Sequence, residues 1–184
     1  MAKLNEPMSK PILVFGYGNE SRGDDALGPL LIEYLEQHCD LDQVDLLTDF
    51  QLQVEHALDL ENRKLVIFAD ASMACQSAFA FDRLIPAKDE SYTTHAMSPA
   101  SVLSVFQAIQ SQALPECYLL SLKGEQFDLG AELSSSARQN LNEASQFLLS
   151  LLQNPDPSFW QQQLQARSEH TSSALQTDPS LEHA

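Results

Sequence analysis

The sequence predicts an α/β protein of three layers, in which a twisted, mostly parallel sheet lies between helices. Two continuous apolar runs, 11–15 and 65–69, are typical of strands that are buried on both faces. Segments with apolar residues at helical spacing alternate with strand-like segments along the chain. This alternation favours parallel strands joined by helices that cover both faces of the sheet.

Local patterns predict the individual elements. Strands are expected over 11–15, 43–48, 65–69, 77–84 and 117–122, and helices near 29–35, 54–60, 98–109 and 137–151. The regular part of the first helix begins near Pro29, because proline is tolerated only in the first turn. Ser98 followed by Pro99 is typical of a helix start, with the serine as N-cap. The alternation at Phe79 and Phe81 indicates a half-exposed strand.

One globular domain is expected over 1–152, followed by a polar, flexible tail over 153–184. The chain has 184 residues and 43% hydrophobic residues, which is enough for one core. From about Gln153 onward, Pro, Gln, Ser and Thr replace the apolar periodicity. Within this tail, Phe159 and Trp160 are the side chains suited to dock on the body of the domain.

The charge and composition of the chain indicate which classes of partner are disfavoured. The formal net charge is −16 and the isoelectric point is near 4.4, which disfavours nucleic acid and anionic membranes. The sequence contains no apolar run long enough to span a bilayer, and no signal peptide is recognised before the first strand. We therefore expect a cytoplasmic protein. The three cysteines, Cys39, Cys75 and Cys117, fit neither a disulfide framework nor a CxxC metal site.

The stretch from Ile12 to Gly28 contains the first candidate site. A strand runs into a glycine-rich turn, and Asp24 and Asp25 follow where a helix begins. The carboxyl edge of an α/β sheet is where such proteins place their chemistry. Acids at a helix N-terminus also cap the helix and complement its dipole, which explains one of the two carboxylates better than both.

Two more side chains are expected at the same edge. Asp70 ends the strand 65–69, and His95 lies in the loop just before the helix that starts at Ser98. On structural grounds alone, Asp70 would be a turn or capping acid and His95 a solvated loop residue. Two carboxylates and one imidazole suit a divalent transition metal. The carboxylates could also polarise a water, with the histidine as proton carrier.

Other sites receive less support from the residues. A dinucleotide site would need a third glycine where Ser21 stands, and the nearby acids would repel a pyrophosphate. A thiol nucleophile would pair Cys75 with His95, but no motif accompanies it. His56 does not begin a zinc helix of the HExxH type.

These residues, taken in order, resemble the hydrogenase maturation endopeptidases. These proteases trim the C-terminal extension of the NiFe hydrogenase large-subunit precursor after nickel insertion. Their opening signature is similar to Gly16-Tyr-Gly-Asn19 followed by Asp24-Asp25 and Gly28. Their apolar strand closing on Asp-Ala resembles Val66-Ile-Phe-Ala-Asp70-Ala71, and their histidine ahead of a helix resembles Thr94-His95-Ala-Met-Ser98-Pro99.

The resemblance covers about 11–152 and extends to the type of hydrogenase. The segment with Gln51, Leu52 and Glu55 is similar to one found in members that serve bidirectional or NAD-reducing hydrogenases. One departure is Ala26, where glycine is frequent in the family. The resemblance also implies the fold, a phosphorylase/hydrolase-like sandwich with a mostly parallel twisted sheet between helices.

The family's nickel-contacting triad falls on Asp25, Asp70 and His95, which leaves a capping role for Asp24. The resemblance implies an aspartyl-type endopeptidase with no cofactor of its own, acting on the large-subunit precursor and recognising the nickel bound there. We expect it to act as a monomer. The hydrolytic water would be activated by Asp25 or Asp70 as a base, or it would be polarised by the nickel.

Two alternatives stay open. A non-catalytic nickel chaperone could use the same triad for delivery. A peptidyl-tRNA-hydrolase-like enzyme could share the sheet and the Gly-x-Gly-Asn turn, although tRNA binding requires a basic face and this chain carries a net charge of −16.

Overall fold

The computed structural model describes residues 9–88 and 97–164, which form a five-stranded sheet of order β2-β1-β3-β5-β4. The strands are β1 (Ile12–Tyr17), β2 (Val44–Asp49), β3 (Leu65–Ser72), β4 (Phe79–Arg83) and β5 (Glu116–Lys123). The first three and β5 are mutually parallel, and β4 pairs with β5 in the antiparallel sense at the edge. The predicted α/β class with a mostly parallel sheet is therefore confirmed.

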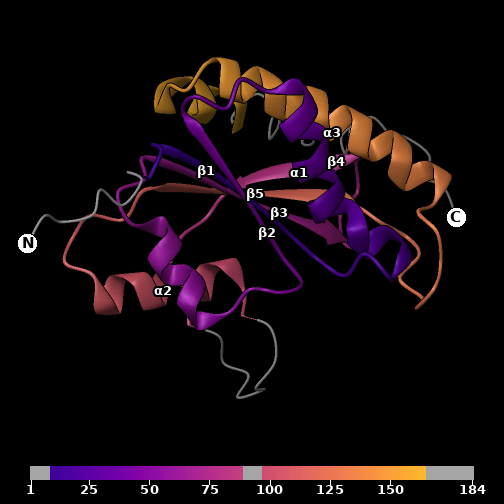
Figure 1. Ribbon diagram of the computed structural model, residues 1–184, viewed down its shortest axis with the longest axis horizontal. Helices are drawn as coiled ribbons and strands as arrows, with labels where there is room; N and C mark the ends of the chain where they lie inside the picture. The colour runs from indigo at the N-terminus through magenta and orange to yellow at the C-terminus, as the bar shows by residue number, and fades with distance from the viewer. Residues whose placement is uncertain (1–8, 89–96, 165–184) are drawn as a thin grey trace, which may run out of the picture.

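Helices cover both faces of the sheet (Figure 1). They are α1 (Leu27–His38), α2 (Pro99–Ile109) and α3 (Ser135–Gln153), together with two short 3-10 helices, η1 (Gly23–Ala26) and η2 (Val54–Leu60). Figure 1 shows α1 and α3 together on one side of the sheet and α2 on the other, and η2 packs on α2. The molecule therefore has the three layers that the sequence predicts.

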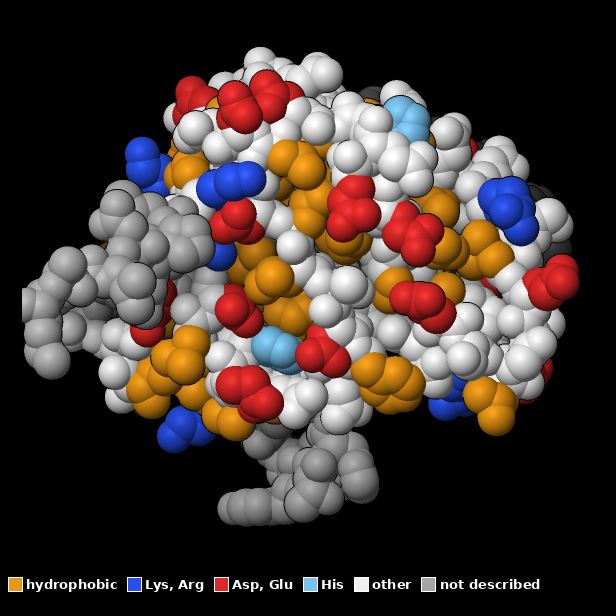
Figure 2. All heavy atoms as spheres, viewed as in Figure 1, with side chains coloured by type: hydrophobic (Ala, Val, Ile, Leu, Met, Phe, Trp, Pro, Cys, Tyr) orange, Lys and Arg blue, Asp and Glu red, His pale blue; other side chains and the backbone are white. Residues whose placement is uncertain are grey.

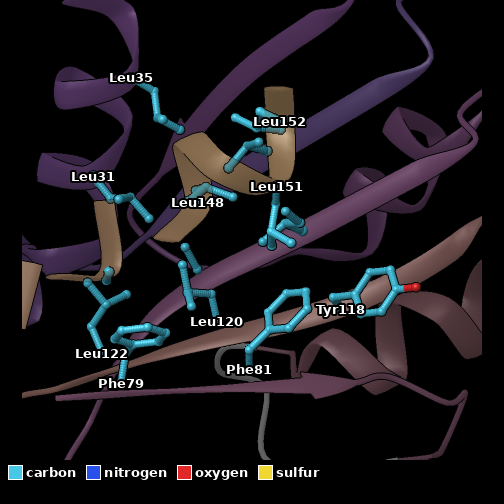
Figure 3. Packing of buried hydrophobic residues seen from close by; sticks show 14 of the residues in the cluster. Leu31, Leu35, Phe79, Phe81, Tyr118, Leu120, Leu122, Leu148, Leu151 and Leu152 are labelled. Carbon is cyan, nitrogen blue, oxygen red and sulfur yellow. The ribbon is translucent and has the colours of Figure 1, made fainter. Parts of the chain in front are cut away.

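Each face of the sheet contributes to its own core. Along β1, Ile12 and Val14 face α1 and α3, whereas Leu13 and Phe15 face α2 and η2. This explains why the central strands read as continuous apolar runs, since successive side chains point to opposite buried faces. In Figure 3, leucines of α1 and α3 lie over aromatic and leucine side chains of β4 and β5, including Phe81 stacked on Tyr118.

The helix starts follow the capping signals. Ser98 accepts a hydrogen bond from the backbone N–H of Ser101 and precedes Pro99 at the first helical position. Ser134 accepts one from Ala137 at the start of α3. Pro29 lies in the first turn of α1, as its missing N–H requires.

The first part of the expected tail, up to residue 164, includes a helical segment that packs on the body of the domain. Residues 157–164 are helical, and Trp160 is fully buried. Its indole Nε1 donates to the carbonyls of Leu151 and Asn154, both at 3.0 Å, and its ring meets the edge of Tyr118 with centroids 5.3 Å apart. One large aromatic side chain that buries its ring and satisfies its N–H outweighs the polar composition around it. Residues 165–184 lie outside the described chain.

Trp160→Ala is expected to lower the free energy of unfolding by about 3–5 kcal/mol, because it leaves a cavity against β4 and β5. Urea denaturation followed by circular dichroism measures this. Gln162→Ala, at an exposed position of the same helical segment, is the control and should change stability by less than about 0.5 kcal/mol. Equal stability of the two variants would mean that the segment does not dock in solution.

The surface is acidic and, within 9–88 and 97–164, no helix is both long and apolar enough to cross a membrane. Figure 2 shows Asp and Glu side chains spread over one face, with Lys and Arg mostly toward its margins.

Candidate functional site

The candidate site lies at the carboxyl edge of the parallel strands. Tyr17 at the end of β1 pairs with Asp49 at the end of β2. In β3, Asp70 follows Ala69, which pairs with Gly16 of β1. The ends of three neighbouring strands thus bring Tyr17, Asp49 and Asp70 to one edge, which is where the sequence predicts Asp70 to lie.

Two glycines allow α1 to begin directly against the sheet. A Cβ added to Gly28 would lie 2.4 Å from the carbonyl oxygen of Tyr17 and 2.8 Å from that of Ala69. A Cβ on Gly16 would lie 2.3 Å from the carbonyl oxygen of Gly28. Only glycine permits so close an approach of helix and strands. The preceding turn η1, which carries Asp25, therefore contacts β3, the strand that carries Asp70.

The turn at Gly18 and Asn19 wraps around Asp25. The Asp25 Oδ2 atom accepts a hydrogen bond from the backbone N–H of Asn19 at 3.1 Å. Gly18 has a φ of 144°, and a Cβ there would lie 2.0 Å from the carbonyl oxygen of Asp25. The Gly-x-Gly-Asn signature thus has a physical role here, since it shapes the turn that holds Asp25. Asp25 itself is half-buried.

Asp70 is the more strongly perturbed of the two carboxylates. The pKa of Asp70 is raised to about 6, chiefly by burial and to a lesser extent by the nearby negative charge of Asp25. Hydrogen bonds from the Tyr17 hydroxyl and the Ala71 backbone act in the opposite direction, because they favour the anion. A carboxyl group with a pKa near neutrality can both accept and return a proton. Carboxylates shifted in this way are typical of functional sites.

Tyr17 belongs to the site although sequence reasoning did not select it. Its hydroxyl hydrogen-bonds the Asp70 carboxyl, and burial followed by the Asp70 charge raises its pKa well above the ordinary value. Tyr17 therefore remains a neutral donor that orients Asp70. The only signal in the sequence is its position at the end of an apolar strand, where an aromatic residue reads as part of the core.

Asp24 has a different role from the predicted cap of its own helix. It is fully buried, and its carboxylate reaches to the connection after β5, where Glu125, Gln126 and Ser134 donate to it. Burial raises its pKa, but these hydrogen bonds outweigh that effect and hold the pKa below its ordinary value. Asp24 is thus an ionised structural residue, and Asp25 is the member of the pair that remains available.

The third predicted site residue, His95, lies outside the described residues. Within the described ranges, no group of three His, Cys, Asp or Glu side chains is arranged to hold a metal ion. Asp25 and Asp70 are close enough to interact electrostatically. The described chain therefore brings together two of the three predicted ligands.

Two other candidates are used for structure. Burial raises the pKa of the Cys75 thiol, whose sulfur contacts the carbonyl oxygens of Ser77 and Ser121, so the nucleophilic thiolate is disfavoured. The His56 Nδ1 atom accepts from the Gln53 backbone at 2.9 Å, and Nε2 lies 3.3 Å from a carboxylate oxygen of Asp49. Nε2 thus links η2 to the end of β2, whereas Nδ1 caps the start of η2 itself.

The fold and this pair of carboxylates define an α/β protein with an acidic site at the carboxyl edge of a parallel sheet. Solved structures that resemble this fold include hydrogenase maturation proteases. The hydrogenase maturating endopeptidase HybD from E. coli is 27% identical, with a TM-score of 0.63, and the match covers 78% of this chain and 93% of that chain.

Other solved proteins agree on the fold. The NiFe hydrogenase maturation protease HycI from Thermococcus kodakarensis is 22% identical, with a TM-score of 0.60 and coverage of 79% of this chain and 94% of that one. An endopeptidase from Escherichia coli is 24% identical with a TM-score of 0.63, covering 78% and 93%. No family model and no curated protein matches the chain. The structure therefore matches that of hydrogenase maturation endopeptidases, which are peptide-bond hydrolases.

Proposed function

We propose that this protein is an endopeptidase that removes the C-terminal extension from the NiFe hydrogenase large-subunit precursor after nickel insertion. The observation that carries the proposal is the juxtaposition of Asp25 and Asp70 at the carboxyl edge, in a fold shared with hydrogenase maturation endopeptidases. Neighbouring residues fix the position of both carboxylates. Gly18 and Asn19 hold Asp25, and the Tyr17 hydroxyl orients Asp70.

In this proposal the nickel belongs to the substrate. Asp25, Asp70 and His95 contact nickel that is already seated in the precursor, as carboxylate oxygens and imidazole nitrogen suit a divalent transition metal. Met97, two residues after His95, donates its backbone N–H to the carbonyl of Leu52 at 3.0 Å, in the connection that follows β2. The chain therefore re-enters the described structure beside the end of β2, which supports His95 as the third contact.

Contact with substrate nickel makes cleavage depend on correct loading. A precursor without nickel lacks the anchor, so it binds less tightly and stays uncut, which is discrimination by differential affinity. The hydrolytic water is activated by the carboxylate of Asp25 or Asp70, or by the nickel itself. The enzyme acts as a cytoplasmic monomer without nucleic acid or membrane partners. The proposed substrate is a hydrogenase of the bidirectional or NAD-reducing type, because the segment with Gln51, Leu52 and Glu55 is similar to one in members that serve this type.

A cleavage assay tests the proposal directly. Purified protein is mixed with large-subunit precursor, nickel-loaded in one reaction and nickel-free in the other, and loss of the C-terminal extension is measured by mass spectrometry. We expect cleavage of the loaded precursor alone. Cleavage of both forms would contradict nickel recognition while leaving the peptidase activity in place. Nickel binding without cleavage of any precursor would favour a chaperone.

A further inference from the structure

We propose that Asp24 is a positioning residue that aims Asp25 at the substrate's nickel, by anchoring the Asp25 loop (18–26) to the β5–α3 connection (124–134). This inference rests on the proposed function, because it assigns Asp24 a part in the recognition step performed by Asp25. Asp24 itself touches neither nickel nor the scissile bond in this proposal.

The Asp24 carboxylate is saturated by donors from the β5–α3 connection. The Oδ2 atom accepts from the backbone N–H of Glu125 at 2.8 Å, from that of Gln126 at 3.0 Å and from the Ser134 hydroxyl at 2.8 Å. The Oδ1 atom accepts from the backbone N–H of Ser134 at 2.8 Å. A fully buried carboxylate with four donors is a strong and geometrically specific anchor.

Further contacts join the same two segments. The backbone N–H of Asp24 donates to the carbonyl of Gln126 at 2.8 Å, and the Arg22 Nε atom donates to that of Phe127 at 3.0 Å. Gly130 donates to the carbonyl of Ser21 at 2.7 Å. A Cβ on Gly124 would lie 2.9 Å from the Cβ of Asp24, so the two segments pack too closely for a side chain at position 124.

The anchor at Asp24 affects Asp25 because Asp25 lies between Asp24 and the turn at Gly18 and Asn19. On one side, the Asn19 backbone donates to the Asp25 carboxylate and Gly18 lies against the Asp25 carbonyl. On the other side, the adjacent Asp24 fixes the backbone to the β5–α3 connection. Loss of that anchor allows the Asp25 carboxylate to move, and misplacement by about 1 Å can reduce a rate by about 100-fold.

Asparagine at position 24 would break the anchor without changing its shape. An amide has one acceptor oxygen and one NH₂ donor. In either orientation the NH₂ group would point at groups that now donate to the carboxylate, either the Ser134 backbone N–H or the donors to Oδ2. The chain offers a matched control in Asp45, another hydrogen-bonded carboxylate with a lowered pKa, which accepts from Arg63 and the Lys10 backbone. Asp45 lies near the amino end of β2, at the opposite edge of the sheet from Asp25.

The test compares Asp24→Asn and Asp45→Asn as full-length proteins at a temperature where both are folded. The kcat and KM of cleavage are measured on nickel-loaded precursor. Hydrogen exchange at the backbone amide of Asn19 reports whether Asp25 keeps its place. For Asp24→Asn we expect kcat/KM to fall by about 10–100-fold and the Asn19 amide to exchange at least about tenfold faster. For Asp45→Asn both should stay within about twofold of the wild type.

The outcomes separate this inference from the proposed function. If wild-type protein cleaves the precursor but Asp24→Asn keeps its kcat/KM or its slow Asn19 exchange, the positioning role is wrong. Equal losses in both variants would also overturn it, since they would reflect stability alone. If wild-type protein cleaves no precursor, the proposed function fails, and unchanged Asn19 exchange would overturn the positioning role as well. Should Asp24→Asn not fold, Ser134→Ala removes one of the donors to Asp24 and is measured in the same way.

Discussion

Substituting alanine for Asp25 or for His95 is expected to abolish processing of the nickel-loaded precursor, with at least about a 100-fold loss in rate. The physical reason is that each variant removes one of the groups proposed to contact the substrate's nickel. Asp25 is half-buried and its carboxylate accepts one hydrogen bond from the Asn19 backbone, so its loss should leave the protein folded. The measurement is the mass-resolved cleavage of precursor, with circular dichroism to establish folding.

Cys75→Ser is the control for this experiment and should process the precursor at the wild-type rate. The Cys75 thiol is buried, and its raised pKa keeps it protonated. Normal processing by Asp25→Ala would contradict the assignment of the site. Loss of processing in Cys75→Ser would instead favour a thiol nucleophile.

The fold is predictable from the sequence because its signals are local. The runs 11–15 and 65–69 occupy central strands that are covered on both faces, so they are apolar throughout. Ser98 with Pro99 marks the start of α2 by the N-cap and first-turn preferences. The alternation around Phe79 and Phe81 corresponds to the edge strand β4, whose exposed end carries Asp82 and Arg83.

The features that the sequence does not reveal depend on long-range contacts. The sequence marks Trp160 as suited to dock on the domain, but it does not reveal the partners, which are the ring of Tyr118 and carbonyls at the end of α3. Asp24 binds Ser134, 110 residues further along the chain. No periodicity or capping rule connects positions so far apart. Local rules therefore predict a helix cap for Asp24, whereas in the structure its carboxylate joins the Asp25 loop to the β5–α3 connection.

Asp24 and Asp70 have opposite effects on stability as pH changes. The pKa of Asp24 is held low in the folded protein, so its ionised form contributes stability at neutral pH that is lost as pH falls below its ordinary range. The pKa of Asp70 is raised in the folded protein, so ionising Asp70 destabilises the fold. At neutral pH the ionised Asp24 therefore stabilises the folded protein, whereas the ionised Asp70 destabilises it.

Asp70→Asn is expected to stabilise the free protein at pH 7 while abolishing processing. The pKa of Asp70 is about 6 in the folded state against an ordinary value of 3.8, which corresponds to about 3 kcal/mol between the two protonation states. Asparagine has a similar shape, can still accept from Tyr17 and bears no charge. Well below pH 3.8 the carboxyl group is protonated in both folded and unfolded chains, so the stability difference between variant and wild type should be smallest there. Wild-type stability should then fall relative to the variant as pH rises from about 4 to 6, and the difference should stay constant above that.

Urea denaturation of wild type and Asp70→Asn at pH 4, 5, 6 and 7 measures this difference, and the cleavage assay measures its functional counterpart. A stability difference that does not change with pH would show that burial does not raise the Asp70 pKa. Wild-type processing by the variant would show that the anion has no part in the reaction. A gain in stability together with a loss of processing is the pattern expected when a carboxylate is kept in a destabilising environment because the chemistry requires it.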